Sequence, residues 1–159
     1  MSRFSRQHEQ RCAELLADGE EFLAAVRAKP KWAVGAAVSG AGGASPDRAD
    51  SPAARKQRKE IADAESVGFP YPKSCALALT DRRIIVHERS AAFGTVKEHV
   101  GDVALTDIGE VRVSDQKGLG DRFRFVMPGD VQVDLYARKK DDSAAFRKLL
   151  EQAMGSAGS

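Results

Sequence analysis

The chain has 159 residues, a length that suits one domain with a substantial hydrophobic core. Hydrophobic residues make up 42% and charged residues 30%, so the composition is that of an ordinary globular protein. The formal net charge is only +2, from 25 basic and 23 acidic side chains, which argues against a dedicated nucleic-acid-binding domain.

The N-terminal segment shows no signal for export or membrane insertion. Its first residues, MSRFSRQHEQR, lack the apolar centre of a secretory signal, and the apolar stretch Trp32–Val38 is too short to span a bilayer. The two cysteines, Cys12 and Cys75, are isolated in apolar patterns, which indicates buried or semi-buried free thiols and not a disulfide framework. We therefore expect a cytoplasmic protein.

The first part of the chain predicts a helix and then a strand. We expect the helix over Ser5–Leu16, with Ser5 as its cap. The side chains at helical spacing are Phe4, His8, Cys12, Leu15 and Leu16. The run Glu21–Arg27 favours a first strand that ends by Pro30, although a helix is an alternative here. Three residues would share one strand face: Phe22, Ala24 and Val26.

A long insertion, about 29–73, follows this strand. Residues 39–51 hold no large apolar side chain, so they predict a flexible loop. We expect a helix from Pro52 to about Ser66, because Ser51 can cap it and proline suits its first position. Its first half is basic and its second half acidic, an order that opposes the helix dipole. The basic residues are Arg55, Lys56, Arg58 and Lys59.

After Pro72 the apolar residues alternate with period two, which predicts six strands joined by short turns. The expected strands are Ser74–Leu79, Arg82–Glu88, Val96–Leu105, Ile108–Ser114, Arg122–Met127 and Val131–Tyr136. The last two form the clearest hairpin, with its turn at Pro128-Gly129 because glycine accepts a positive φ at the second corner. Gly109 is expected to form a bulge, since the alternation slips there.

The chain closes with an amphipathic helix from about Ser143 to Met154 and a disordered tail, 155–159. The apolar stripe of this helix consists of Phe146, Leu149, Leu150, Ala153 and Met154. Seven antiparallel strands leave exposed edges and an open mouth, for which such a helix is a natural plug. We therefore predict an α+β, mostly β, fold: a seven-stranded antiparallel barrel capped by the C-terminal helix and preceded by an N-terminal helix within 1–19.

The hairpin with the sequence LTDRRI, residues 79–84, together with the succession of strands and the final helix, resembles the PH-like superfamily, particularly bacterial PH-like and GRAM-type domains. The resemblance covers 20–27 and 74–154 and implies one PH-like domain over 20–154. Such domains bind phosphoinositides, peptides or proteins, or serve as structural modules. Lipid-binding members carry a basic motif around the first two strands and their loop, and Lys56-Gln57-Arg58 is similar to its basic-x-Arg pattern.

Two basic groups could contact an anion or a lipid surface: the run 55–59, and Arg138-Lys139-Lys140 at a strand end. Arg82-Arg83, at another strand end, could join the second group in an anion cradle at one rim. The alternative for the first group is a solvated helix face with ion pairs four residues apart, Lys56–Glu60 and Lys59–Asp63. Trp32, the only tryptophan, could anchor a protein partner or pack over the mouth of the barrel.

Catalytic and metal-binding patterns are weak. His8, His87 and His99 do not have the spacing of a metal motif, and we expect them on a helix surface and on two strand faces. Cys75 and His87 would lie on neighbouring strands without a third, orienting residue. The Gly-Leu-Gly segment 118–120 lacks the Lys-Ser/Thr of a phosphate-binding loop and predicts a hairpin tip. We therefore predict no catalytic residue, no cofactor and no metal.

These observations predict a non-enzymatic PH-like binding or scaffolding module whose partner is a protein. The alternative is a peripheral binder of anionic membrane lipids that uses the basic insertion helix. The sequence does not indicate an oligomeric state.

Overall fold

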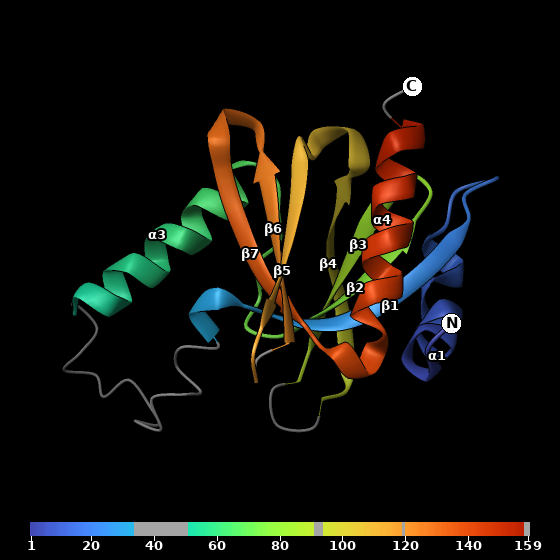
Figure 1. Ribbon diagram of the computed structural model, residues 1–159, viewed down its shortest axis with the longest axis horizontal. Coiled ribbons are helices and arrows are strands. Elements are labelled where there is room, and N and C mark those ends of the chain that lie inside the picture. Colours follow the sequence, from blue (N-terminus) through green and yellow to red (C-terminus); the bar gives the residue numbers. More distant parts are fainter. Residues whose placement is uncertain (34–50, 91–93, 119, 158–159) are drawn as a thin grey trace.

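The computed structural model describes residues 1–33, 51–90, 94–118 and 120–157. Seven strands form one antiparallel sheet in the order β4-β3-β2-β1-β7-β6-β5 (Figure 1). They are β1 (Phe22–Pro30), β2 (Cys75–Thr80), β3 (Arg83–Arg89), β4 (Val96–Ala104), β5 (Glu110–Gln116), β6 (Gly120–Met127) and β7 (Val131–Ala137). Since β4 and β5 stand at the two ends of this order, the predicted barrel is an open seven-stranded sheet within the described residues.

The α-helices whose full bounds lie in the described residues are α1 (Arg3–Cys12), α3 (Pro52–Ser66) and α4 (Ser143–Ala157). Short 3₁₀ turns join other elements, among them η1 (Ala13–Leu15), η3 (Leu105–Asp107) and η5 (Lys139–Asp141). In the described residues no helix is both long enough and apolar enough to cross a membrane. Figure 1 shows α4 and α1 on one side of the molecule and α3 on the other.

The main core lies between the inner face of the sheet and α4. Phe146 and Leu150 of α4 are fully buried against strand residues such as Phe123, so the expected capping helix is confirmed. The helix extends to Ala157, three residues beyond the predicted end, so 155–157 are helical and not a disordered tail. Residues 158–159 lie outside the described part.

A second, smaller core lies under α1, on the outer face of the sheet. The alternation expected in β3 is confirmed, because Ile84 and Val86 enter the main core while Ile85 enters the small one. Phe22 also joins the small core. The pairing of β1 with β2 shifts in register between Phe22 and Ala24, so these two side chains point to opposite faces of the sheet. The prediction that Phe22 shares a face with Ala24 was wrong.

The start of α1 differs from the prediction. The helix begins at Arg3 and its cap is Ser2, whose Oγ accepts a hydrogen bond of 3.0 Å from the Ser5 amide. Ser5 lies within α1, and its side chain is buried against β1. Its Oγ donates to the Ala25 carbonyl at 2.9 Å and accepts from the Ala25 amide at 2.8 Å. Ser5 therefore docks α1 on β1. His8, expected on the helix surface, is also buried.

The predictions for α3, the last hairpin and the bulge at Gly109, which rest on cap, turn and alternation signals, agree with the structure. The helix α3 has the predicted bounds, and the Ser51 Oγ accepts from the Ala54 amide at 3.1 Å. The last hairpin forms with a turn in which Gly129 has φ 75°. Gly109 donates its amide to the Val126 carbonyl at 2.8 Å while Glu110 pairs with the same residue, an arrangement that fits the expected bulge. The predicted flexible loop lies outside the described residues, except for Ser51.

Candidate functional site

The basic residues of α3 are all exposed. Arg55, Lys56, Arg58 and Lys59 occupy the first half of the helix, and Ala64 in its second half is the buried residue. The helix packs against β7. Of the ion pairs between described residues, none joins Lys56 to Glu60 or Lys59 to Asp63, so the expected intrahelical pairs are not formed. The start of α3 therefore offers a solvated basic surface.

The second basic group lies elsewhere. Arg138, Lys139 and Lys140 are exposed in and beside η5, immediately before α4, and Lys139 Nζ is paired with Asp115 Oδ1 at 2.8 Å. In Figure 1 the start of α4 and the start of α3 lie on opposite sides of the view. The structure does not bring the two predicted basic groups together into one surface.

Trp32 packs against the main core and is half-buried, with its Nε1 atom buried and without a hydrogen-bond partner among the described residues. This is the packing alternative of the two sequence interpretations. Its role as a partner anchor stays a prediction.

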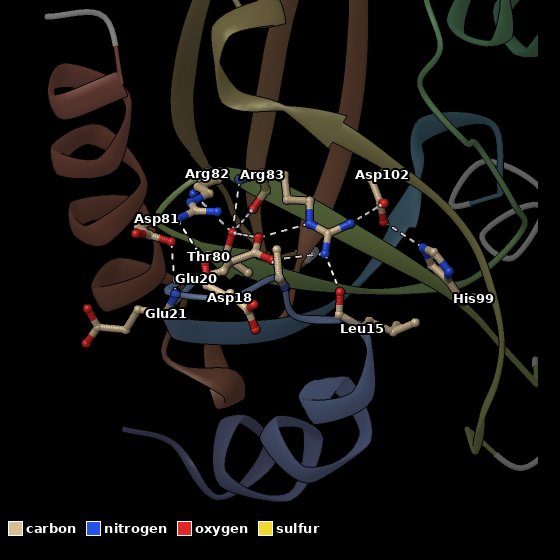
Figure 2. Close-up of polar contacts among 11 residues, drawn as sticks. Leu15, Asp18, Glu20, Glu21, Thr80, Asp81, Arg82, Arg83, His99 and Asp102 are labelled. Carbon is tan, nitrogen blue, oxygen red and sulfur yellow. Dashed lines mark hydrogen bonds and ion pairs between the residues drawn. The ribbon is translucent and has the colours of Figure 1, made fainter.

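The turn between β2 and β3 is the centre of a polar network (Figure 2). Arg83 at the start of β3 donates to both carboxylate oxygens of Glu20, from Nε and from Nη2, at 2.9 Å each. Its Nη2 also donates to the Leu15 carbonyl and its Nη1 to Asp102 Oδ2, each at 2.5 Å. Asp102 Oδ1 lies 2.6 Å from His99 Nε2. Arg83 thus joins the N-terminal segment to β3 and β4.

Other polar residues of the hairpin complete this network. Thr80 Oγ1 accepts from the amides of Arg82 and Arg83 at 3.1 and 3.0 Å and donates to Glu20 Oε2 at 2.7 Å. The hydrogen bonds from Arg83 are the main reason why the pKa of Glu20 falls to about 2. The conspicuous residues of the 79–84 hairpin are therefore used inside the fold, and we assign them no ligand.

The two edges of the sheet differ in regularity. The register of β4 against β3 shifts twice, around His87, and Val100 of β4 is 40% exposed. Pro70 also lies so close to Gly101 of β4 that a Cβ there would stand 2.7 Å from its Cγ. By contrast, β5 pairs with β6 in unbroken register from Glu110 to Gln116. Within the described residues, the β5 edge is therefore the more regular of the two sheet edges.

The chain was compared with known proteins. No protein-family model and no curated protein matches it. Among solved structures, it is similar to a DUF1696 family protein with a pleckstrin-homology domain from Shewanella loihica PV-4. The TM-score is 0.50 and the sequence identity 11%, over 94% of this chain and 92% of that chain. The fold is PH-like. At this identity the likeness concerns the fold of the PH-like chain and not its ligand.

Most hydrogen-bond partners of the 79–84 hairpin could not be predicted from the sequence. Glu20 and Asp102 carried no local motif, because each meets Arg83 only through the tertiary fold. Cys75 and His87 lie on neighbouring strands, as predicted, but on opposite faces of the sheet. Cys75 faces the main core, whereas His87 faces α1. Burial raises the pKa of Cys75 to about 12, so this thiol stays protonated.

Proposed function

We propose that this PH-like chain is a non-enzymatic interaction module that binds an extended segment of a partner protein along the free edge of β5. The observation that carries the proposal is the regular register of β5 at the end of the sheet. A strand at a sheet edge presents backbone amides and carbonyls that an added strand can pair with, and several recognition domains bind peptides in this way.

The side chains of β5 fit such a partner. Val111 and Val113 pack against the main core, yet both stay partly exposed at the edge. A strand added beside them would cover this remaining apolar surface. Glu110 and Arg112 neutralise each other through hydrogen bonds of 3.1 Å, so they leave no unbalanced charge in the row. We therefore infer a partner strand with apolar residues at alternate positions.

Peptide selection followed by NMR mapping tests this function. Peptides selected from a random library on the folded chain should shift and protect the backbone amides of 110–116 most strongly. Val113→Lys should weaken binding of the selected peptide, whereas Val100→Lys at the β4 edge is the matched control and should not. Mapping of the peptide to another surface, or failure of any peptide to be enriched, would overturn the proposal.

A second candidate function rests on the exposed basic half of α3. Four basic side chains, Arg55, Lys56, Arg58 and Lys59, project there on a part of the helix without buried residues. Such a segment can be attracted to an anionic lipid surface. The observation supports weak peripheral membrane binding and is independent of the β5 edge.

A further inference from the structure

A cluster of soft-metal donors lies between α1 and the outer face of the sheet. His8 and Cys12 are four residues apart on α1 and therefore share one face of that helix. His87 projects toward them from β3. One potential ligand atom from each of these three side chains lies within 4.8 Å of the other two. All three residues are at most 3% exposed.

Two nitrogens in this cluster lack hydrogen bonds. His8 Nε2 and His87 Nδ1 are buried and have no partner among the described residues. Their rings meet edge to face, with centroids 5.0 Å apart. A buried polar atom without a partner destabilises the fold, so two of them in one cluster favour a bound ligand that satisfies both.

The donor set is typical of a particular class of ion. Imidazole nitrogen and cysteine sulfur are the usual ligands of zinc and of related divalent first-row metals. Zinc–nitrogen and zinc–sulfur bonds of about 2.0–2.3 Å place tetrahedral ligands roughly 3.5 Å apart, so the side chains would need to approach by about 1 Å.

We propose that His8, Cys12 and His87 form a zinc-type metal site that fastens α1 to β3. The site is separate from the β5 edge and independent of the proposed function. Because α1 and β3 are far apart in the sequence, a metal held by both would stabilise the docked N-terminal helix, as any ligand that binds only the folded state does.

The surroundings of the cluster fit this assignment. The ring of His99 lies 5.6 Å from that of His87, and its Nε2 is hydrogen-bonded to Asp102, a histidine–carboxylate pair that often supports metal ligands. His8 also lines a groove between α1 and 94–96, so one of the three donor residues borders the surface.

The protonation states are compatible with metal binding. Burial is the main reason why the pKa values of His8 and His87 fall to about 4; His87 and Arg11 add to the effect on His8, and His99 and Arg11 add to the effect on His87. Both rings are therefore neutral donors near pH 7. Burial raises the pKa of the Cys12 thiol to about 11. Binding of a metal would therefore release the Cys12 proton.

Cobalt(II) titration of the full, reduced, metal-stripped chain tests the site. One Co²⁺ per chain should bind and produce a thiolate-to-cobalt charge-transfer absorption, which zinc should abolish by displacement. His8→Gln and His87→Gln should each weaken cobalt binding at least about tenfold. In both variants the thermal midpoint should rise less on addition of zinc than it does in the natural chain.

The two cysteines provide matched variants, because the chain has no others. Cys75→Ser retains only Cys12 and should keep the absorption, whereas Cys12→Ser should lose it. If Cys12→Ser does not fold, the absorption of Cys75→Ser still assigns the sulfur ligand. The proposal fails if the natural chain gives no thiolate absorption, or if Cys75→Ser loses it.

Discussion

Arg83 holds the Glu20 carboxylate through two hydrogen bonds of 2.9 Å each, between residues 63 positions apart in the sequence. The Glu20 side chain is only 1% exposed, while that of Arg83 is 23% exposed. Leu15 and Asp102 accept from the same guanidinium. The arginine of this hairpin therefore fastens the segment before β1 to the sheet.

This pair predicts a loss of stability in acid. The pKa of Glu20 falls to about 2 in the folded chain, mainly through the hydrogen bonds from Arg83, and it returns to about 4.3 on unfolding. The unfolded chain thus binds the proton more readily, so the contribution is fully present above about pH 5 and is lost as pH falls toward 2. The loss is on the order of 3 kcal/mol.

Urea unfolding at a series of pH values measures this contribution. Glu20→Gln should be less stable than the natural chain at pH 7, and its free energy of unfolding should fall less between pH 5 and pH 3. Glu21, the neighbouring acid, does not bind Arg83, so Glu21→Gln is the matched control and should leave the acid dependence unchanged. Equal acid dependence in Glu20→Gln and the natural chain would contradict the assignment.

The features that could be predicted from the sequence are those set by residues close together in the chain. The bounds of α3 follow from Ser51 and Pro52, and the last hairpin follows from its alternating residues and Pro128-Gly129, because cap and turn signals act over a few positions. The alternation could not reveal the shift after Phe22, since a bulge inverts every face beyond it without changing composition. The sheet order also depends on long-range pairing.

The candidate sites also divide into one set by local sequence and one set by long-range contacts. The basic half of α3 can be recognised in the sequence, and it is exposed because it holds no large apolar side chain that could be buried. The meeting of His8 with His87 depends on the docking of α1, so no spacing rule could find it. One signal was present: His8 and Cys12 are four residues apart, which places two potential metal ligands on one helix face.

The packing of α4 predicts unequal effects of two adjacent leucines. Leu150 is fully buried, whereas Leu149 is only partly buried at the edge of the same core. Leu150→Ala should lower the free energy of unfolding by about 2–5 kcal/mol, as for other buried leucines. Leu149→Ala should cost clearly less. Chemical denaturation of both variants checks this, and a larger loss for Leu149→Ala would mean that the helix docks in another orientation.

The turn before β6 predicts a contrast between two glycines. Both have positive φ, +82° at Gly118 and +95° at Gly120. A Cβ at Gly120 would stand 2.3 Å from the Ala137 carbonyl oxygen, whereas a Cβ at Gly118 would meet no atom within 4 Å. Gly118→Ala should cost about 1–2 kcal/mol for its backbone conformation alone. Gly120→Ala must also displace β7, so its thermal midpoint should fall further; equal midpoints would contradict this geometry.

The basic half of α3 predicts weak, salt-dependent binding to anionic vesicles. Each basic residue near an anionic surface contributes about 1 kcal/mol, so Arg55, Lys56, Arg58 and Lys59 together supply a few kcal/mol at most. Exposed charges are screened over about 8 Å at physiological ionic strength, so binding should fade as salt rises. Co-sedimentation with vesicles of phosphatidylserine and phosphatidylcholine measures it, with phosphatidylcholine alone as the neutral reference.

Charge reversal locates the binding surface. Lys56→Glu together with Lys59→Glu should abolish sedimentation without unfolding the chain, because both side chains are exposed and neither enters a core. Arg138→Glu with Lys140→Glu changes the net charge equally at η5, away from α3, and should leave most binding intact. If the second pair abolishes binding and the first does not, the surface is at η5. If the natural chain ignores anionic vesicles even at low salt, this function is excluded and the β5 edge is left as the binding surface.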